Sequence, residues 1–138
     1  MKGTKEDYII YRISKSSEIF ADAELLANNQ RWNSCINRLY YSSFYLASAL
    51  LFKNDIKAET HNGVKTQLFL NFVKDGMLSR EHGKLYSHLF DWRQETDYAD
   101  FIDFDEELVN PLIQEVKDLN LKLIELIHMI ISSSFENY

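Results

Sequence analysis

Residues 31–51, RWNSCINRLYYSSFYLASALL, form the longest uninterrupted pattern of apolar side chains at helical spacing in this chain of 138 residues. Apolar or small residues recur there every three or four positions, as one face of an α-helix requires. They are Trp32, Ile36, Leu39, Ser43, Ala47 and Leu50. Arg38, Tyr41 and Tyr45 share a second face of the same helix. A helix with these two faces is predicted to lie at the centre of the fold, between two neighbouring helices.

The composition favours a single all-α domain. Four Gly and one Pro provide too few turn residues for a many-stranded sheet, and hydrophobic residues make up 46% of the chain. A length of 138 residues suits one domain that spans positions 1–138. We therefore expect an up-and-down antiparallel bundle of about five helices. The apolar spacing predicts helices at residues 4–28, 31–54, 61–74, 79–97 and 105–133.

Polar and special residues mark the ends of these helices. Thr4, Thr60 and Asp105 are predicted N-caps, because their side-chain oxygens can accept hydrogen bonds from free amides of the first turn. Gly76 is predicted to end the third helix in a left-handed conformation. Pro111 lies one turn into the last helix, so this helix either begins at Asn110 or is kinked at the proline.

The last predicted helix carries more apolar surface than one seam needs. A heptad series runs along it, with further isoleucines outside the series. The series is Val109, Leu112, Val116, Leu119, Leu123, Leu126 and Ile130, and the additional residues are Ile113, Ile124, Ile127 and Ile131. A large exposed apolar patch usually marks an interface. We therefore predict a homodimer.

Charge and cysteine content indicate a cytoplasmic protein. The formal net charge is −6, so contact with a nucleic acid requires a local basic patch. Cys35 is the one cysteine, which excludes an internal disulfide and suits a reducing compartment. The first ten residues lack the apolar core of a signal peptide, and charged residues interrupt the apolar stretch 108–131 too often for a membrane span.

Neither a metal site nor a cofactor is expected. The four histidines are scattered, and His82 and His88 point to different sides of a helix, so they cannot bind one metal ion together. The four glycines are isolated and form no phosphate-binding loop.

Residues 91–100, DWRQETDYAD, allow two interpretations. Arg93 and Asp97 are four positions apart, and the simpler interpretation is a surface salt bridge worth a few tenths of a kcal/mol, with Tyr98 packing where the helix ends. In the second interpretation, Arg93 and Arg38 reach one groove and bind a phosphate or a base, because guanidinium groups suit phosphate.

Three further residues complete this candidate ligand- or RNA-binding groove. Tyr41 and Tyr98 offer rings on which a nucleobase can stack. His61 begins the third helix and is the one histidine we consider as an acid or base near the groove. Asp97 is expected to orient Arg93 and to offset part of the positive charge. No catalytic residue is assigned.

Three segments resemble those of prokaryotic HEPN-domain proteins. Residues 36–44, INRLYYSSF, resemble the Arg-x-Tyr-Tyr-x-x-Phe segment of that family. THNGV at 60–64 and FVKDG at 72–76 resemble its His-x-Gly and Phe-Val-Lys-x-Gly stretch. RQETDY at 93–98 resembles the Arg-x-x-x-Asp-Tyr that ends its penultimate helix. The resemblance extends over about residues 7–131 and implies an all-α bundle that is commonly a homodimer.

The resemblance also implies a role near RNA. Many HEPN proteins act in RNA processing, defence or toxin–antitoxin systems, often with a minimal nucleotidyltransferase as partner. Active members are metal-independent RNases with an Arg, a polar residue and a His a few positions later. This chain has Arg93 and Gln94, but Asp97 and Tyr98 stand where the His is expected. A phenol is a poor general base at neutral pH, which disfavours an enzyme.

Three functions follow as hypotheses. The first is a HEPN bundle that binds RNA, a nucleotide or a nucleotidyltransferase partner without strong catalysis, in a toxin–antitoxin or RNA-related defence setting. The second is an RNase in which His61 or Tyr98 replaces the absent histidine. The third is a helical interaction module that binds no nucleotide and whose polar groove is ordinary surface.

Overall fold

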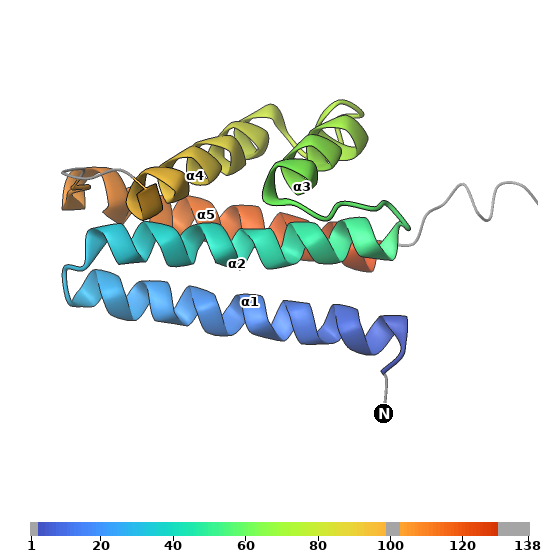
Figure 1. Cartoon of the computed structure of the whole chain (residues 1–138), viewed down its shortest axis with the longest axis horizontal. Coiled ribbons are helices and arrows are strands. Elements are labelled where there is room, and N and C mark those ends of the chain that lie inside the picture. Colours follow the sequence, from blue (N-terminus) through green and yellow to red (C-terminus); the bar gives the residue numbers. More distant parts are fainter. Residues whose placement is uncertain (1–2, 99–102, 130–138) are drawn as a thin grey trace, which may run out of the picture.

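The computed structural model describes residues 3–98 and 103–129. It has the predicted all-α architecture, and no strand occurs in these two ranges. The elements are α1 (Lys5–Asn28), α2 (Trp32–Lys53), α3 (His61–Leu68), the π-helix η1 (Phe69–Val73), α4 (Arg80–Tyr98) and α5 (Glu106–His128). The long helices α1 and α2 lie side by side, and α3 and α4 cross the opposite side of α2 (Figure 1). No described helix is long and apolar enough to cross a bilayer.

The central position predicted for residues 31–54 is confirmed. Helix α2 contacts α1, α3, α4 and α5, which is more neighbours than the two expected. Its side chains are buried on most sides, and Leu39, Tyr40, Leu46 and Leu50 have no exposed surface. The residues of α2 therefore connect the four other α-helices of the bundle.

The predicted helix ends agree with the structure to within a few residues. Thr4 forms a capping box with Asp7, and the side chain of Asp105 accepts a hydrogen bond from the amide of Leu108. Gly76 adopts a φ of 81°, the left-handed conformation that glycine tolerates best. Helix α5 begins at Glu106, so a start at Asn110 is wrong and the proline lies inside the helix.

The third predicted helix is not uniform. Its first part is the α-helix α3, and its second part is the π-helix η1, in which the amide of Lys74 donates to the carbonyl of Phe69 at 2.9 Å. Leu68 and Phe72 are both buried across this change. The core face of this segment is therefore continuous from α3 into η1.

The described part of α5 does not provide the exposed apolar patch that we expected from its isoleucines. Ile127 is buried, and Ile113 and Ile124 pack against the core of the same chain. These isoleucines therefore leave no large apolar patch, although the homodimer itself stays a prediction. Helix α5 ends at His128, and residues 130–133 of the predicted helix, with Ile130 and Ile131, lie outside the described residues.

A polar network crosses the core between α1, α2 and α5. The hydroxyl of Ser43 donates to Oδ1 of Asn120 at 2.7 Å, and Nδ2 of Asn120 donates to the hydroxyl of Ser42 at 3.0 Å. The hydroxyl of Ser16 on α1 donates to the carbonyl of Ser42 at 2.7 Å. All four side chains are buried, so the network fixes how the three helices align.

Candidate functional site

The candidate site begins with a contact between α2 and α3. Thr60 caps α3, since its hydroxyl accepts a hydrogen bond from the amide of Gly63, and this places His61 at the first helical position. Nδ1 of His61 lies 2.8 Å from the hydroxyl of Tyr40. The imidazole also packs on the Phe44 ring, with the ring centroids 4.4 Å apart.

Burial determines the protonation of this pair. It raises the pKa of Tyr40 to about 12, so the phenol keeps its proton at neutral pH. Burial, and then the positive charge of Arg93, lower the pKa of His61, while Asp97 partly opposes them. The imidazole is therefore neutral at pH 7. Since Tyr40 has a proton to donate, Nδ1 can accept it and Nε2 can carry the ring proton.

Arg93 is buried rather than available in a groove. Its residue is 6% exposed, and the guanidinium lies 5.1 Å from the ring centroid of Tyr40 and 5.7 Å from that of Phe90. Nη1 lies 3.6 Å from a carboxylate oxygen of Asp97, and the buried Nε has no hydrogen-bond partner among the described residues. Arg93 therefore holds α4 against α2.

Tyr86 is covered in the same way as Arg93. Both side chains carry polar atoms, which are typical of an outer helix face, but the structure buries Tyr86 completely against α2. Burial raises the pKa of Tyr86 well above its ordinary value, and the neighbouring Tyr40 adds to this shift. Both sides of α4 are therefore largely covered.

Of Arg38 and Arg93, Arg38 is the more accessible arginine. It is half-buried, and its guanidinium lies 5.1 Å from the ring centroid of Tyr41. Nη2 of Arg38 donates to Oδ1 of Asn37 at 2.9 Å, and Nδ2 of Asn37 donates to Oδ1 of Asp97 at 3.2 Å. No carboxylate in residues 3–98 or 103–129 lies within ion-pair distance of Arg38. Its charge is therefore held in place without being neutralised.

A hollow of about 420 Å³ lies beside Arg38, between α2 and the end of α4. Arg38 and Asp97 are the charged residues of its lining. The complete lining is Leu26, Asn33, Ser34, Asn37, Arg38, Thr96 and Asp97. This volume falls within the range of small-ligand pockets, although the hollow is open to solvent.

Five of the six residues predicted for the site are joined through contacts between neighbours. They are Arg38, Tyr41, His61, Arg93 and Asp97, and Tyr40 and Asn37 are the residues that link them. Tyr98 is the last residue of α4, and its side chain lies outside the described residues. Whether these residues bind a ligand stays a prediction.

Two members of the cluster were missed by the sequence analysis. The sequence analysis named neither Tyr40 nor Asn37 as a site residue. A phenol within a buried stripe needs a hydrogen-bond partner, and this signal could have identified Tyr40. Asn37 has no comparable signal, because its bonds to Arg38 and Asp97 depend on how α4 meets α2. No group of three or more potential metal ligands occurs in the part of the chain that the structure describes.

The bundle and this cluster define an all-α protein with a polar site where α2, α3 and α4 meet. The chain belongs to the HEPN domain family, whose sequence profile matches residues 10–126. A "UPF0332 protein" of Thermotoga maritima is 38% identical over 124 residues, which cover 88% of this chain and 94% of the relative.

Two proteins of Methanocaldococcus jannaschii carry the name "Putative toxin", and each is 28% identical to this chain. The first alignment covers 75% of this chain and 70% of the relative. The second covers 63% of this chain and 65% of the relative.

Proposed function

We propose that this HEPN protein binds RNA through the surface around Arg38. The observation that carries the proposal is a half-buried guanidinium that rests on the Tyr41 ring and lacks a carboxylate partner among the described residues. Asn37 accepts two of its N–H groups, which fixes the plane of the guanidinium. The remaining donors suit a phosphate oxygen at the rim of the adjacent hollow.

In this proposal the two arginines have different roles. Arg38 contacts the phosphate, while the buried Arg93 positions Tyr40 and Asp97 and does not itself reach the RNA. The net charge of −6 opposes RNA over the rest of the surface. Binding is therefore local, and it weakens as salt concentration rises.

A toxin–antitoxin setting is part of the proposal. It is supported by membership of the HEPN family and by the names of the two Methanocaldococcus relatives. The resemblance to HEPN proteins adds two partners, a second copy of this chain and a minimal nucleotidyltransferase. Sedimentation at tens of micromolar should give a dimer mass, and a monomer mass would contradict the dimer. Co-purification with a nucleotidyltransferase encoded beside this chain would test the second partner.

RNA binding is tested with fluorescently labelled single-stranded RNA and with tRNA, by anisotropy at several salt concentrations. Arg38→Gln should weaken binding and reduce the dependence of log affinity on log salt by about 0.7 for each phosphate contact with single-stranded RNA that it removes. Arg80→Gln is the matched control, because Arg80 is exposed at the start of α4 and does not line the hollow. If a folded Arg38→Gln variant binds RNA as tightly as the unchanged protein, the surface around Arg38 is not the RNA-binding site.

Metal-independent RNA cleavage is the second candidate, and the position of His61 favours it. Tyr40 engages Nδ1, which leaves Nε2 to exchange a proton with a ribose hydroxyl. Arg93 and Asp97 influence the imidazole electrostatically. In this role His61 replaces the histidine that the family motif carries after its arginine. Incubation with total RNA and tRNA tests this role. Cleavage should be lost in His61→Gln and in Arg93→Ala, and cleavage that persists in a folded His61→Gln variant would exclude His61.

A further inference from the structure

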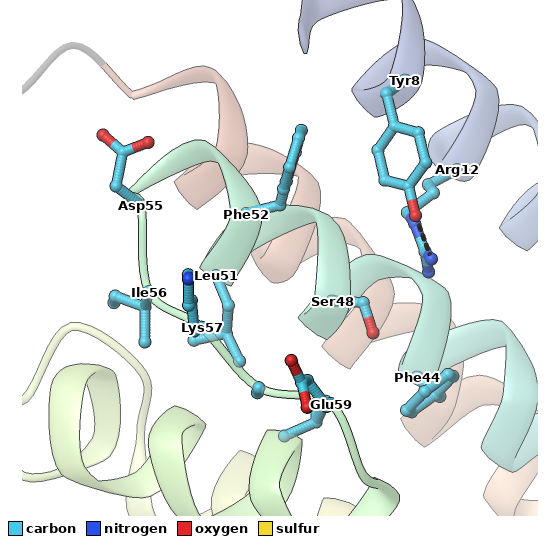
Figure 2. Close-up of a pocket in the computed structure, with 12 residues that line it drawn as sticks. Tyr8, Arg12, Phe44, Ser48, Leu51, Phe52, Asp55, Ile56, Lys57 and Glu59 are labelled. Carbon is cyan, nitrogen blue, oxygen red and sulfur yellow. Dashed lines mark hydrogen bonds between the residues drawn. The ribbon is translucent and has the colours of Figure 1, made fainter.

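A second hollow is lined by Phe44, the residue whose ring packs against His61. Its volume is about 480 Å³, and it opens between the first half of α1, the second half of α2 and the connection before α3. Figure 2 shows Tyr8 and Arg12 reaching from α1, Phe44, Ser48 and Phe52 on α2, and the segment with Asp55 and Glu59 on the remaining side. Of these residues, the sequence analysis had drawn attention only to Phe44, as part of the segment that resembles HEPN proteins.

Aromatic rings form much of this second hollow. Tyr8 and Phe52 pack with their ring centroids 4.8 Å apart, and Phe44 forms part of the wall. Leu51, Ile56 and Val64 add aliphatic surface. Rings of this kind provide platforms on which a planar group can stack.

Arg12 provides a positive charge at the same place. Its guanidinium lies 4.8 Å from the ring centroid of Tyr8 and 5.2 Å from that of Tyr45, and Nη2 donates to the Tyr8 hydroxyl. None of the ion pairs within residues 3–98 and 103–129 includes Arg12. A half-buried guanidinium held by two rings and a neutral hydroxyl can accept an anionic partner.

Among the charged residues around the hollow, Arg12 is the one that can bind an anion. Asp55 pairs with Lys5, so its carboxylate is already compensated. Lys57 and Glu59 are exposed and of opposite sign. The lining itself has two positive and two negative residues, and Lys5, which pairs with Asp55 from outside the lining, leaves one excess positive charge beside the aromatic surface. The Ser48 hydroxyl and the Glu59 carboxylate provide hydrogen-bonding groups. An acyl chain cannot form hydrogen bonds with these polar groups, whereas a nucleobase can.

From these contacts we propose that the second hollow binds one nucleotide unit, with the base against Tyr8, Phe44 and Phe52 and the phosphate on Arg12. The nucleotide is either free or part of an RNA strand. The strand version rests on the proposed function. Phe44 lines this hollow and contacts Tyr41, on which Arg38 rests, so a strand held near Arg38 would reach the hollow past these two rings.

The test uses the full-length protein and two probes. Calorimetry measures the four ribonucleoside 5′-monophosphates, and anisotropy measures a labelled single-stranded oligoribonucleotide. Arg12→Gln and Phe52→Ala should each weaken binding at least about fivefold, as expected for a lost stacking or phosphate contact. Phe52→Trp keeps a stacking ring and should bind normally, with quenched fluorescence. Lys15→Gln removes the same charge from α1 outside the hollow and should change affinity less than twofold.

Each outcome either distinguishes a free nucleotide from a nucleotide within an RNA strand, or contradicts the proposed site. Weaker monophosphate binding in Arg12→Gln indicates a free nucleotide, and an effect on the oligonucleotide alone indicates a strand. Equal effects of Lys15→Gln and Arg12→Gln, or unchanged binding of both probes in folded Arg12→Gln and Phe52→Ala variants, overturn the site. Arg38→Gln separates the two proposals. An effect of Arg38→Gln alone leaves only the Arg38 surface, and an effect of Arg12→Gln alone leaves only the second hollow.

Discussion

The hydroxyl of Tyr40 lies 2.8 Å from Nδ1 of His61, so one hydrogen bond joins the middle of α2 to the first residue of α3. The same phenol ring lies under the guanidinium of Arg93 from α4. Three helices therefore meet at one side chain. Because α2 contacts every other α-helix, a change at this point affects how the candidate site is held and how the bundle is packed.

The first prediction concerns the dependence of stability on pH. Burial and Arg93 lower the pKa of His61 in the folded protein below its ordinary value of 6.5. Between the folded pKa and 6.5, the unfolded chain binds more protons than the folded chain, so the free energy of unfolding rises with pH in this window. Stability is consequently lost as pH falls through 6.5, with a slope of at most about 1.4 kcal/mol per pH unit, and the loss levels off below the folded pKa.

Urea unfolding of the unchanged protein and of His61→Gln, between pH 5 and pH 7.5, measures this contribution. The difference between the two proteins isolates His61, because all other titrating groups are shared. We expect the stability advantage of the unchanged protein over His61→Gln to shrink as pH falls. An advantage that stays constant, or that grows toward pH 5, would contradict the assignment.

The second prediction separates the two arginines by their effect on stability. Arg93→Ala removes a buried guanidinium from the rings of Tyr40 and Phe90, and we expect it to cost on the order of 2 kcal/mol. Arg38→Ala alters a half-buried side chain that forms no ion pair with the described residues. It should change the free energy of unfolding by less than about 0.5 kcal/mol. Urea unfolding at pH 7.5 compares the two. Equal losses would mean that Arg93 does not anchor α4.

The helices themselves were predictable because each local signal agrees with the packing. The apolar spacing of residues 31–54 indicated a buried helix, and Thr4, Thr60 and Asp105 marked where helices begin. These features act within a few residues of the chain, so they can be identified without knowledge of the partners.

The pairing of helix faces could not be predicted in the same way. Tyr86 and Arg93 carry polar atoms, which suggested an outer face, yet rings from α2 and α4 cover both residues. The hollow beside Arg12 depends on a contact between α1 and residues 55–59, and no sequence pattern links these segments. The π-helix η1 was not predictable either, because Leu68 and Phe72 are four residues apart, which is also the spacing of an ordinary α-helix.

The third prediction tests the register of α2 and α5 in the core. Leu39 and Leu123 have no exposed surface, and changing either to alanine should cost about 2–5 kcal/mol. Leu121 is the matched control, because it is 58% exposed on the same helix as Leu123. Leu121→Ala should change stability by less than about half a kcal/mol. A similarly small loss for Leu39→Ala or Leu123→Ala would contradict the assigned core.

The fourth prediction concerns the polar network that joins α2 to α5. Asn120→Leu removes the acceptor of the Ser43 hydroxyl and the donor to the Ser42 hydroxyl, which leaves buried polar atoms without these partners. We expect a loss of about 1–3 kcal/mol, since an unsatisfied buried group costs more than the bond it formed. Adding Ser43→Ala removes one of the stranded hydroxyls. The double variant should therefore lose less stability than the sum of the two single variants. Urea unfolding of all four proteins closes this double-mutant cycle, and strict additivity would mean that Ser43 and Asn120 act independently.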